Sequence, residues 1–180
     1  EKRMVIRQLL IPILLIIAAL LYQPVKNFFY PTEKPAGMKS DGGNLTVSYI
    51  DVGQGDATLI SKGNFHMLID AGKNEKGTEV VSYLKSKNIS TIDIVVGTHP
   101  DSDHIGGVDD VLDNFKVKTV YLPEMGKATK TYREVEAALK RSGKKDKMPE
   151  IGRNYTYDGN VVVRFLGPVK QSHDANNNSL

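Results

Sequence analysis

The sequence predicts an α/β layered domain, and three observations support this expectation. The chain has 180 residues, which is enough to bury one core of ordinary size. Apolar residues make up 40% and charged residues 25%, a composition typical of folded proteins. Short β-rich segments come first after the N-terminal region, and helical and strand patterns alternate behind them. Such an order indicates a sheet covered by helices.

The first 23 residues are expected to form a signal-anchor or signal peptide. Lys2, Arg3 and Arg7 precede an apolar run over residues 9–21, which is the pattern of a targeting segment. No small-residue cleavage site is evident, so an uncleaved hydrophobic helix is favoured over a cleaved signal. Because basic flanks stay in the cytoplasm, the protein is expected to be membrane-anchored or secreted, with its domain outside the cytoplasm.

A linker rich in proline and glycine is expected over residues 24–43, because it shows no periodic apolar pattern. The folded domain is then expected over residues 44–180. Alternating β-rich residues predict its first strand at 45–52, and a glycine-rich turn precedes a second strand at 57–61. A short hairpin connection leads to a third strand at 65–70.

Helices and strands alternate in the remaining part of the domain. A helix is expected from Thr78, as its N-cap residue, to about Lys87, with apolar residues along one face. A buried strand at 92–97 follows. Further segments are then expected in the order helix, strand, helix, strand, at residues 107–115, 117–122, 131–141 and 161–166.

Four potential metal ligands lie within six residues, directly after the buried strand: His99, Asp101, Asp103 and His104. In an extended turn, residues two apart project to the same side, so His99 and Asp101 can hold one ion while Asp103 and His104 hold a second. Two ions about 3.5–4 Å apart can share a bridging hydroxide that acts as the nucleophile. A solvated loop with one helix-capping histidine is the alternative, but the density of ligands favours a metal site. The chain has no cysteine, so thiolate ligands are excluded.

This segment resembles the H-x-H-x-D-H motif of the metallo-β-lactamase superfamily, with Asp101 in place of the second histidine. Two further segments match in the same order, D-V-G-Q-G-D-A at 51–57 and L-I-D-A-G at 68–72. Together with the terminal Asn-Asn-Ser-Leu, they resemble the hydrolase domain of ComEC-type DNA-uptake proteins and its stand-alone relatives. The resemblance covers about residues 45–180.

The resemblance implies an αβ/βα four-layer sandwich, of which the N-terminal portion is present, with a dinuclear site at the sheet edge. It implies that Asp103 acts in catalysis as well as in metal binding. Asp70 would brace the ligand loop from behind. Asp56 would do the same or would only form the turn. Asn177 and Asn178 would line the site.

The chain departs from the family pattern in two respects. Asp101 makes the site richer in oxygen, which favours manganese and leaves magnesium or a mixed site open beside zinc. The family's later ligands, an aspartate in a T-G-D segment and a final histidine, would follow Leu180, so the domain is expected to be truncated at its C-terminus. His66 is expected to lie at the surface, and His173 is a weak ligand candidate.

The leading hypothesis is a metal-dependent phosphodiesterase, namely a nuclease acting on extracellular DNA through metal-activated water. Hydrolysis of a β-lactam or thioester remains an alternative, because a fold does not fix the substrate. A non-catalytic DNA-binding or uptake module is the third. Expected partners are DNA or another phosphodiester, and the membrane through the N-terminal segment. Arg141, Lys144, Lys145 and Lys147 form either a solvated helix end or a phosphate-tracking surface.

Overall fold

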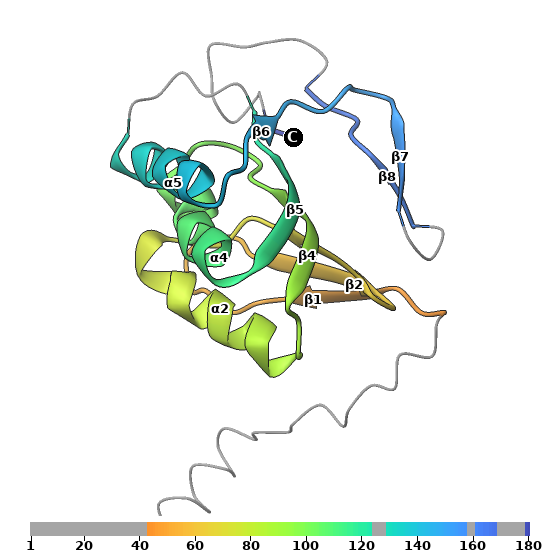
Figure 1. The fold of residues 1–180 in the computed structure, drawn as a ribbon, viewed down its shortest axis with the longest axis horizontal. Helices are drawn as coiled ribbons and strands as arrows, with labels where there is room; N and C mark the ends of the chain where they lie inside the picture. Colours follow the sequence, from red (N-terminus) through yellow and green to blue (C-terminus); the bar gives the residue numbers. More distant parts are fainter. Residues whose placement is uncertain (1–42, 124–128, 158–160, 169–178) are drawn as a thin grey trace, which may run out of the picture. The chain divides into compact units, whose positions relative to one another are not determined.

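The computed structural model describes residues 43–123, 129–157, 161–168 and 179–180. The chain divides into two units, residues 1–39 and 40–180, and all described residues belong to the second. That unit contains a six-stranded sheet in the order β1-β2-β3-β4-β5-β6 (Figure 1). Its strands are β1 (Thr46–Tyr49), β2 (Thr58–Lys62), β3 (Phe65–Ile69), β4 (Thr91–Val96), β5 (Lys116–Tyr121) and β6 (Asp146–Lys147).

The sheet changes direction once. The first three strands form an antiparallel meander, and β3 to β6 pair in parallel. In β4, five of the six residues are buried, because helices cover one face of this strand and a hairpin covers the other. A central parallel strand covered on both faces is typically a continuous apolar run, which explains the Ile92–Val96 segment. Asp93 interrupts the run, and its carboxylate accepts hydrogen bonds from His66 N (2.9 Å) and Lys118 Nζ (2.6 Å).

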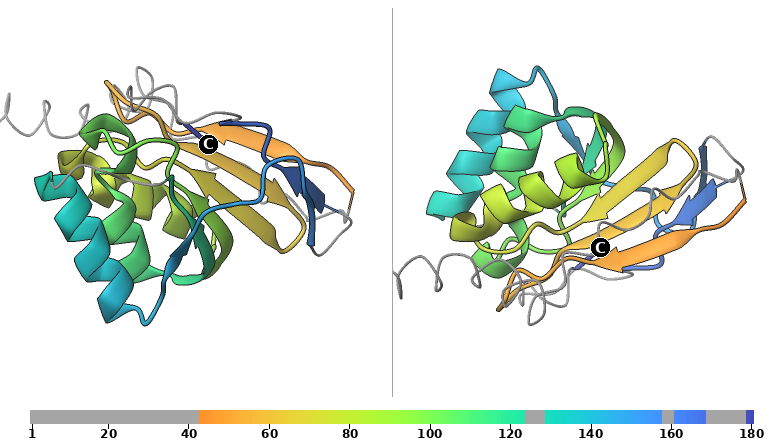
Figure 2. Two further views of the ribbon diagram at one scale, coloured as in Figure 1. Left: turned by 90° about the horizontal axis from the view of Figure 1, so that it is seen from above. Right: turned by 90° about the horizontal axis from the view of Figure 1, so that it is seen from below.

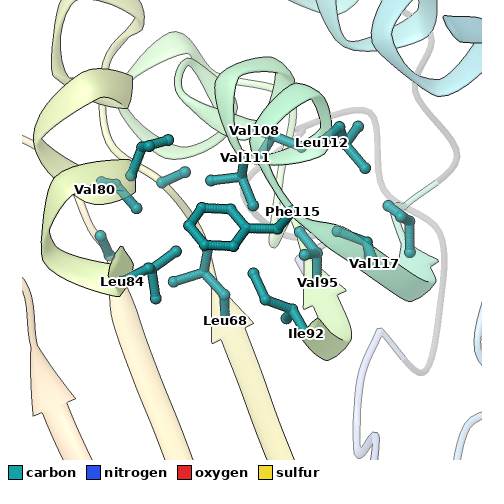
Figure 3. Packing of buried hydrophobic residues seen from close by; sticks show 14 of the residues in the cluster. Leu68, Val80, Leu84, Ile92, Val95, Val108, Val111, Leu112, Phe115 and Val117 are labelled. Carbon is teal, nitrogen blue, oxygen red and sulfur yellow. The ribbon is translucent and has the colours of Figure 1, made fainter. Parts of the chain in front are cut away.

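Three helices cover one face of the sheet, α2 (Gly77–Ser86), α4 (Val108–Asn114) and α5 (Lys130–Arg141) (Figures 1 and 2). Two short helical turns, η1 (Asn74–Lys76) and α3 (Ser102–Ile105), lie in the loops that follow β3 and β4. Apolar residues three or four apart on each helix face the sheet. Figure 3 shows the ring of Phe115 at the centre of this core, among side chains from α2, α4 and the sheet.

A second core lies on the opposite face of the sheet. The hairpin of β7 (Asn154–Tyr157) and β8 (Val161–Arg164) covers this face over the central strands (Figure 2). Buried side chains of the sheet contact buried side chains of the hairpin region in this core: Phe65, Met67, Ile94, Val96, Tyr121, Val161 and Phe165. At β1 and the residue before it, the described part of the chain leaves Leu45, Val47 and Tyr49 exposed.

The described elements confirm the predicted α/β architecture with small shifts at the boundaries. Two details differ from expectation. The helix predicted to start at Thr78 begins at Gly77, and Thr78 donates its hydroxyl proton to Glu79 instead of capping the backbone. Gly77 permits the earlier start, since a Cβ there would lie 2.0 Å from a carboxylate oxygen of Asp110. The strand pairing of β6 with β5 was not foreseen.

Several expectations concern parts of the chain outside the described residues. These are the N-terminal hydrophobic helix, most of the linker, and the positions of Asn177, Asn178 and His173. Within the described ranges, no helix combines the length and the apolar character needed to cross a membrane.

Candidate metal centre

The four predicted ligands lie at the carboxyl ends of the parallel strands. The chain leaves β3 at Asp70, whose N–H donates to Val96 O (2.8 Å), and it leaves β4 at Gly97, whose N–H donates to Tyr121 O (3.0 Å). These bonds align the ends of three neighbouring strands. In α/β sheets this edge is where ligands bind, because the connecting loops diverge there. The segment Thr98–Gly107, called the ligand loop below, starts at this edge.

The local sequence explains how the ligand loop turns back toward the sheet. Asp101 has an extended backbone (φ −77°, ψ 147°), and its carbonyl accepts from His104 N and Ile105 N, so the short helix α3 starts directly after it. Close packing follows at two glycines. A Cβ would lie 2.2 Å from Asn74 N at Gly106 and 2.5 Å from Ala71 O at Gly107. A larger residue at either position would push the ligand loop away from the turn after β3.

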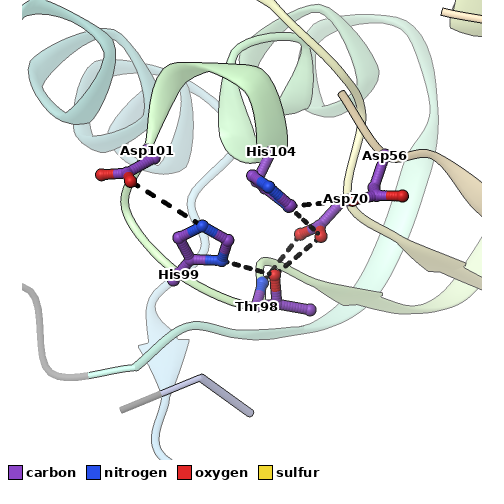
Figure 4. Close-up of polar contacts among 6 residues, drawn as sticks. All are labelled: Asp56, Asp70, Thr98, His99, Asp101 and His104. Carbon is purple, nitrogen blue, oxygen red and sulfur yellow. Dashed lines mark hydrogen bonds and ion pairs between the residues drawn. The ribbon is translucent and has the colours of Figure 1, made fainter. Parts of the chain in front are cut away.

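The two histidines form the centre of the site (Figure 4). The rings of His99 and His104 are 3.8 Å apart between centroids and tilted by 47°. His99 is buried, with 8% of its surface exposed, and its Nε2 lies 3.8 Å from Asp101 Oδ2. His99 and Asp101 therefore lie beside each other, and their sharing of one ion stays a prediction. The Nδ1 of His104 contacts Asp70, so only the Nε2 of His104 is left to share an ion with Asp103.

The carboxylate of Asp70 supports the ligand loop through three contacts. It is 2% exposed and accepts from Thr98 N (2.8 Å), Thr98 Oγ1 (2.7 Å) and His104 Nδ1 (2.8 Å). Its backbone is left-handed, with φ 57°, a conformation that costs most L-residues about 1–2 kcal/mol and that aspartate adopts more readily than most residues. This backbone directs the side chain under the loop rather than into the sheet.

The glycine-rich turn at residues 51–57 contacts the ligand loop through its backbone. Asp56 N donates to Asp103 O (3.1 Å), and Gly72 N donates to Asp56 O (2.8 Å). Gly55 lies so close that a Cβ there would be 2.3 Å from Asp103 O. The side chain of Asp56 is 71% exposed, with Oδ2 3.7 Å from His104 Nδ1. Asp56 thus contacts the ligand loop by its N–H and the turn after β3 by its carbonyl, while its carboxylate is exposed.

A polar cavity of about 470 Å³ adjoins the ligand loop. Its lining comes from the ligand loop and from the start of α5: Pro100, Asp101, Ser102, Asp103, Thr129 and Thr131. Thr129 Oγ1 accepts from Tyr132 N (3.1 Å) and so caps α5. Thr131 Oγ1 donates to Asn74 Oδ1 (3.0 Å), which connects α5 to the turn after β3. Asp101 and Asp103 therefore both belong to the lining of this cavity.

The donor atoms of the site suit a divalent cation of borderline hardness, because imidazole nitrogens and carboxylate oxygens are combined. The geometry is less closed than that of a complete metal site. Among the residues that the structure describes, no three His, Asp or Glu side chains converge as a ready-made ligand set. The structure places His99 beside both His104 and Asp101, and Asp70 contacts His104 from the buried side. Asp103 belongs to the lining of the adjoining cavity.

Sequence reasoning assigned no role to Thr98, which contacts both Asp70 and His99. A hydroxyl residue directly before the first histidine of the motif is the signal that could have identified it. His66 was expected at the surface, but it is half-buried, and its Nδ1 lies 2.9 Å from Ser61 Oγ. Burial lowers the pKa of His66 below its ordinary value, and the nearby carboxylate of Asp93 opposes this shift. Arg141, from the predicted basic cluster, forms a two-point ion pair with Asp113.

Comparisons with known proteins give relatives and similar folds. Recombination protein 2 of Haemophilus influenzae is 32% identical over 92 residues, covering 48% of this chain and 12% of that protein. ComE operon protein 3 of Bacillus subtilis is 30% identical over 115 residues, covering 54% of this chain and 14% of that protein. The chain therefore spans only about one eighth of the length of these relatives.

Two solved structures have similar folds. A metallo-beta-lactamase of Cronobacter sakazakii is 16% identical, and the match covers 62% of this chain and 46% of the lactamase chain, with a TM-score of 0.46. The chemotaxis sensor ODP, solved as a peroxy diiron species, is 17% identical, covers 67% and 48%, and has the same TM-score of 0.46. The family model of the metallo-beta-lactamase superfamily matches residues 50–175, a range that contains the turn at 51–57, Asp70 and the whole ligand loop. On this match over more than half of its length, the chain belongs to the metallo-beta-lactamase superfamily.

Proposed function

We propose that the protein is a divalent-metal-dependent phosphodiesterase that cleaves DNA. The observation that carries the proposal is the His99–His104 ring pair, 3.8 Å between centroids, beside the carboxylate of Asp101 at the mouth of a polar cavity. Proteins of this fold family typically bind divalent metals such as zinc. One relative is named for recombination, a process of DNA, which supports a nucleic-acid substrate for the present chain.

Each residue has a distinct part in this proposal. His99, Asp101, Asp103 and His104 hold the cation or cations, and Asp101 supplies a harder oxygen ligand where the family motif has histidine. When bound, divalent cations neutralise phosphate charge and lower the pKa of water. Asp103 belongs to the lining of the cavity. In this proposal its carboxylate accepts a proton from the attacking water. The exposed carboxylate of Asp56 lies at the rim, and Asp70 orients the loop from the buried side.

A non-catalytic DNA-binding module is the second candidate, and one observation favours it. No three candidate ligands in the described part of the chain converge on a common point. A protein that keeps the fold without a closed ligand set would bind DNA through its surface and would not turn it over. Metal binding and DNA cleavage therefore have to be measured separately.

The test uses the intact purified protein with single- and double-stranded DNA, in Mn²⁺ and in EDTA. Asp103→Ala removes the cavity carboxylate, and Asp113→Ala is the matched control, because Asp113 bonds Arg141 on the surface of α4 instead. Loss of a general base typically costs about 100-fold or more in rate. We expect Mn²⁺-dependent cleavage that falls by this factor in Asp103→Ala and is unchanged in Asp113→Ala. Mn²⁺ binding without cleavage overturns the nuclease proposal, and DNA binding without Mn²⁺ binding supports the non-catalytic module.

A further inference from the structure

We infer that Thr98 is a positioning residue that, together with Asp70, fixes the protonated nitrogen of both His99 and His104, leaving Nε2 of each ring as the atom available to a cation. The inference rests on the proposed metal role of the two histidines. It concerns the metal-free protein, so it can be tested without turnover. The evidence is the hydrogen-bond arrangement around a single buried carboxylate.

The arrangement starts at Asp70. An ionised carboxylate only accepts hydrogen bonds, so every polar group in contact with it has to donate. His104 Nδ1 lies 2.8 Å from Asp70 Oδ2, and this nitrogen must therefore carry the proton. The lone pair of neutral His104 is consequently on Nε2. The same carboxylate oxygen accepts the hydroxyl proton of Thr98 at 2.7 Å.

The second step passes through Thr98. A hydroxyl group has one proton, and Thr98 gives it to Asp70. The hydroxyl oxygen of Thr98 lies 3.1 Å from His99 Nδ1 and can then only accept a hydrogen bond from it. His99 Nδ1 must carry a proton, and its Nε2, the nitrogen that faces Asp101 Oδ2 at 3.8 Å, holds the lone pair. One carboxylate thus determines the state of both rings, directly for His104 and through a hydroxyl for His99 (Figure 4).

The backbone makes this relay rigid. Thr98 N donates to Asp70 Oδ1 (2.8 Å), so Thr98 contacts both oxygens of the carboxylate, and its own carbonyl accepts from Leu180 N (3.0 Å). The hydroxyl has little freedom to turn toward another partner. Outer contacts of this kind are typical of metal-binding histidines, and their removal costs about 10- to 100-fold in metal affinity.

The test measures the histidine tautomers of the metal-free intact protein by long-range ¹H–¹⁵N NMR at a pH where the rings are neutral. His66→Asn and His173→Asn variants assign the signals of His99 and His104. We expect both rings protonated at Nδ1. In Thr98→Val, which keeps the shape and removes the hydroxyl, His99 should lose this preference while His104 keeps it. The unchanged His104 signal then shows that the fold and the Asp70 contact are intact.

Thr98→Ser is the rescue variant, since it restores the hydroxyl, and it should return His99 to the Nδ1-protonated form. Calorimetry with Mn²⁺ should show affinity reduced about 10- to 100-fold in Thr98→Val and near wild type in Thr98→Ser. Nε2-protonated His99 in the wild-type protein, or a tautomer in Thr98→Val identical to wild type, overturns the inference. If Thr98→Val does not fold, Thr98→Ala removes the same hydroxyl, and the same two outcomes for His99 decide the inference. These spectra are independent of DNA cleavage, so this inference and the proposed function can fail separately.

Discussion

Replacing Asp70 by asparagine tests the buried carboxylate on which the candidate site is built. The substitution keeps the size of the side chain, and asparagine accepts the left-handed backbone at φ 57° as readily as aspartate does. Any effect therefore comes from hydrogen bonding rather than from shape or backbone strain. Two of the three contacts end on Oδ2, those from Thr98 Oγ1 and His104 Nδ1.

The magnitude follows from these two contacts. Asparagine can keep its oxygen opposite Thr98 N. Its NH₂ group, which is a donor, then faces the Thr98 hydroxyl and His104 Nδ1, the two groups that donate to Oδ2 of Asp70. Hydrogen bonds to charged groups contribute about 1.5–3 kcal/mol each, and neutral ones about 1 kcal/mol. If the Thr98 hydroxyl rotates and His104 moves its proton to Nε2, two neutral bonds are regained. We therefore expect the free energy of unfolding to fall by about 1–4 kcal/mol, and Mn²⁺ affinity to fall about 10- to 100-fold, because Nε2 of His104 no longer carries a lone pair.

Urea denaturation of the metal-free protein, followed by circular dichroism, measures the first quantity, and calorimetry with Mn²⁺ measures the second. Asp51→Asn is the matched control, because Asp51 is exposed and its carboxylate accepts a local bond from Gly53 N (3.1 Å). The control should change stability by less than about 0.5 kcal/mol. Equal stability and equal Mn²⁺ affinity in Asp70→Asn and wild type would refute the reasoning, since the carboxylate would then not organise the site.

Two further predictions concern packing and pH. Gly55→Ala should lower the free energy of unfolding by about 1–3 kcal/mol in urea denaturation, because the new Cβ would lie 2.3 Å from Asp103 O. Gly53→Ala is the control, because open space surrounds Gly53 and the substitution should cost only the strain of a left-handed backbone. Equal losses of stability in the two variants would contradict the packing argument. Burial lowers the pKa of His66 from 6.5, so His66 binds a proton more readily in the unfolded chain than in the folded one. The contribution of neutral His66 to the free energy of unfolding is therefore complete above about pH 6.5 and is lost as the pH falls below this value. Denaturation between pH 5 and 7.5 should show this decline, with a smaller slope in His66→Gln, and an identical slope in the two proteins would exclude His66 as its source.

The sequence predicted the framework of the fold because strong local patterns determine it. The apolar run in β4 is interrupted only by Asp93, and the amphipathic pattern of α5 starts within one residue of the expected position. The predicted N-cap of α2, Thr78, lies two residues after the observed one, Lys76, and the first residue of the helix, Gly77, packs against Asp110 where a Cβ would not fit. Helix boundaries depend on tertiary contacts of this kind, which local propensity does not contain.

The candidate site was predictable in composition but not in arrangement. The spacing of the motif placed His99 beside Asp101, as the structure has it. The same spacing argument paired Asp103 with His104, and this pairing stays a prediction. It could not contain the contact of His104 Nδ1 with Asp70, which is 34 residues away in the chain. Only the parallel pairing of β3 with β4 brings these segments together. The assignment of the four residues as metal ligands, and the roles of Asp70 and Asp56 toward a metal, stay predictions.

The distance along the chain between the partners of the site determines when the site can form during folding. His99 and His104 are neighbours in sequence, but their support comes from Asp70, which is 28 residues before Thr98 and 34 before His104. Contacts of such sequence separation form late, because loop closure must be completed before they contribute. Consider a chain in which only the helices and the β2–β3 hairpin have formed. In such a chain neither the His99 ring nor the His104 ring has a fixed orientation. The ordered ring pair is therefore a reporter of completed parallel strand pairing, and an ion bound at it would stabilise only molecules that have passed this step.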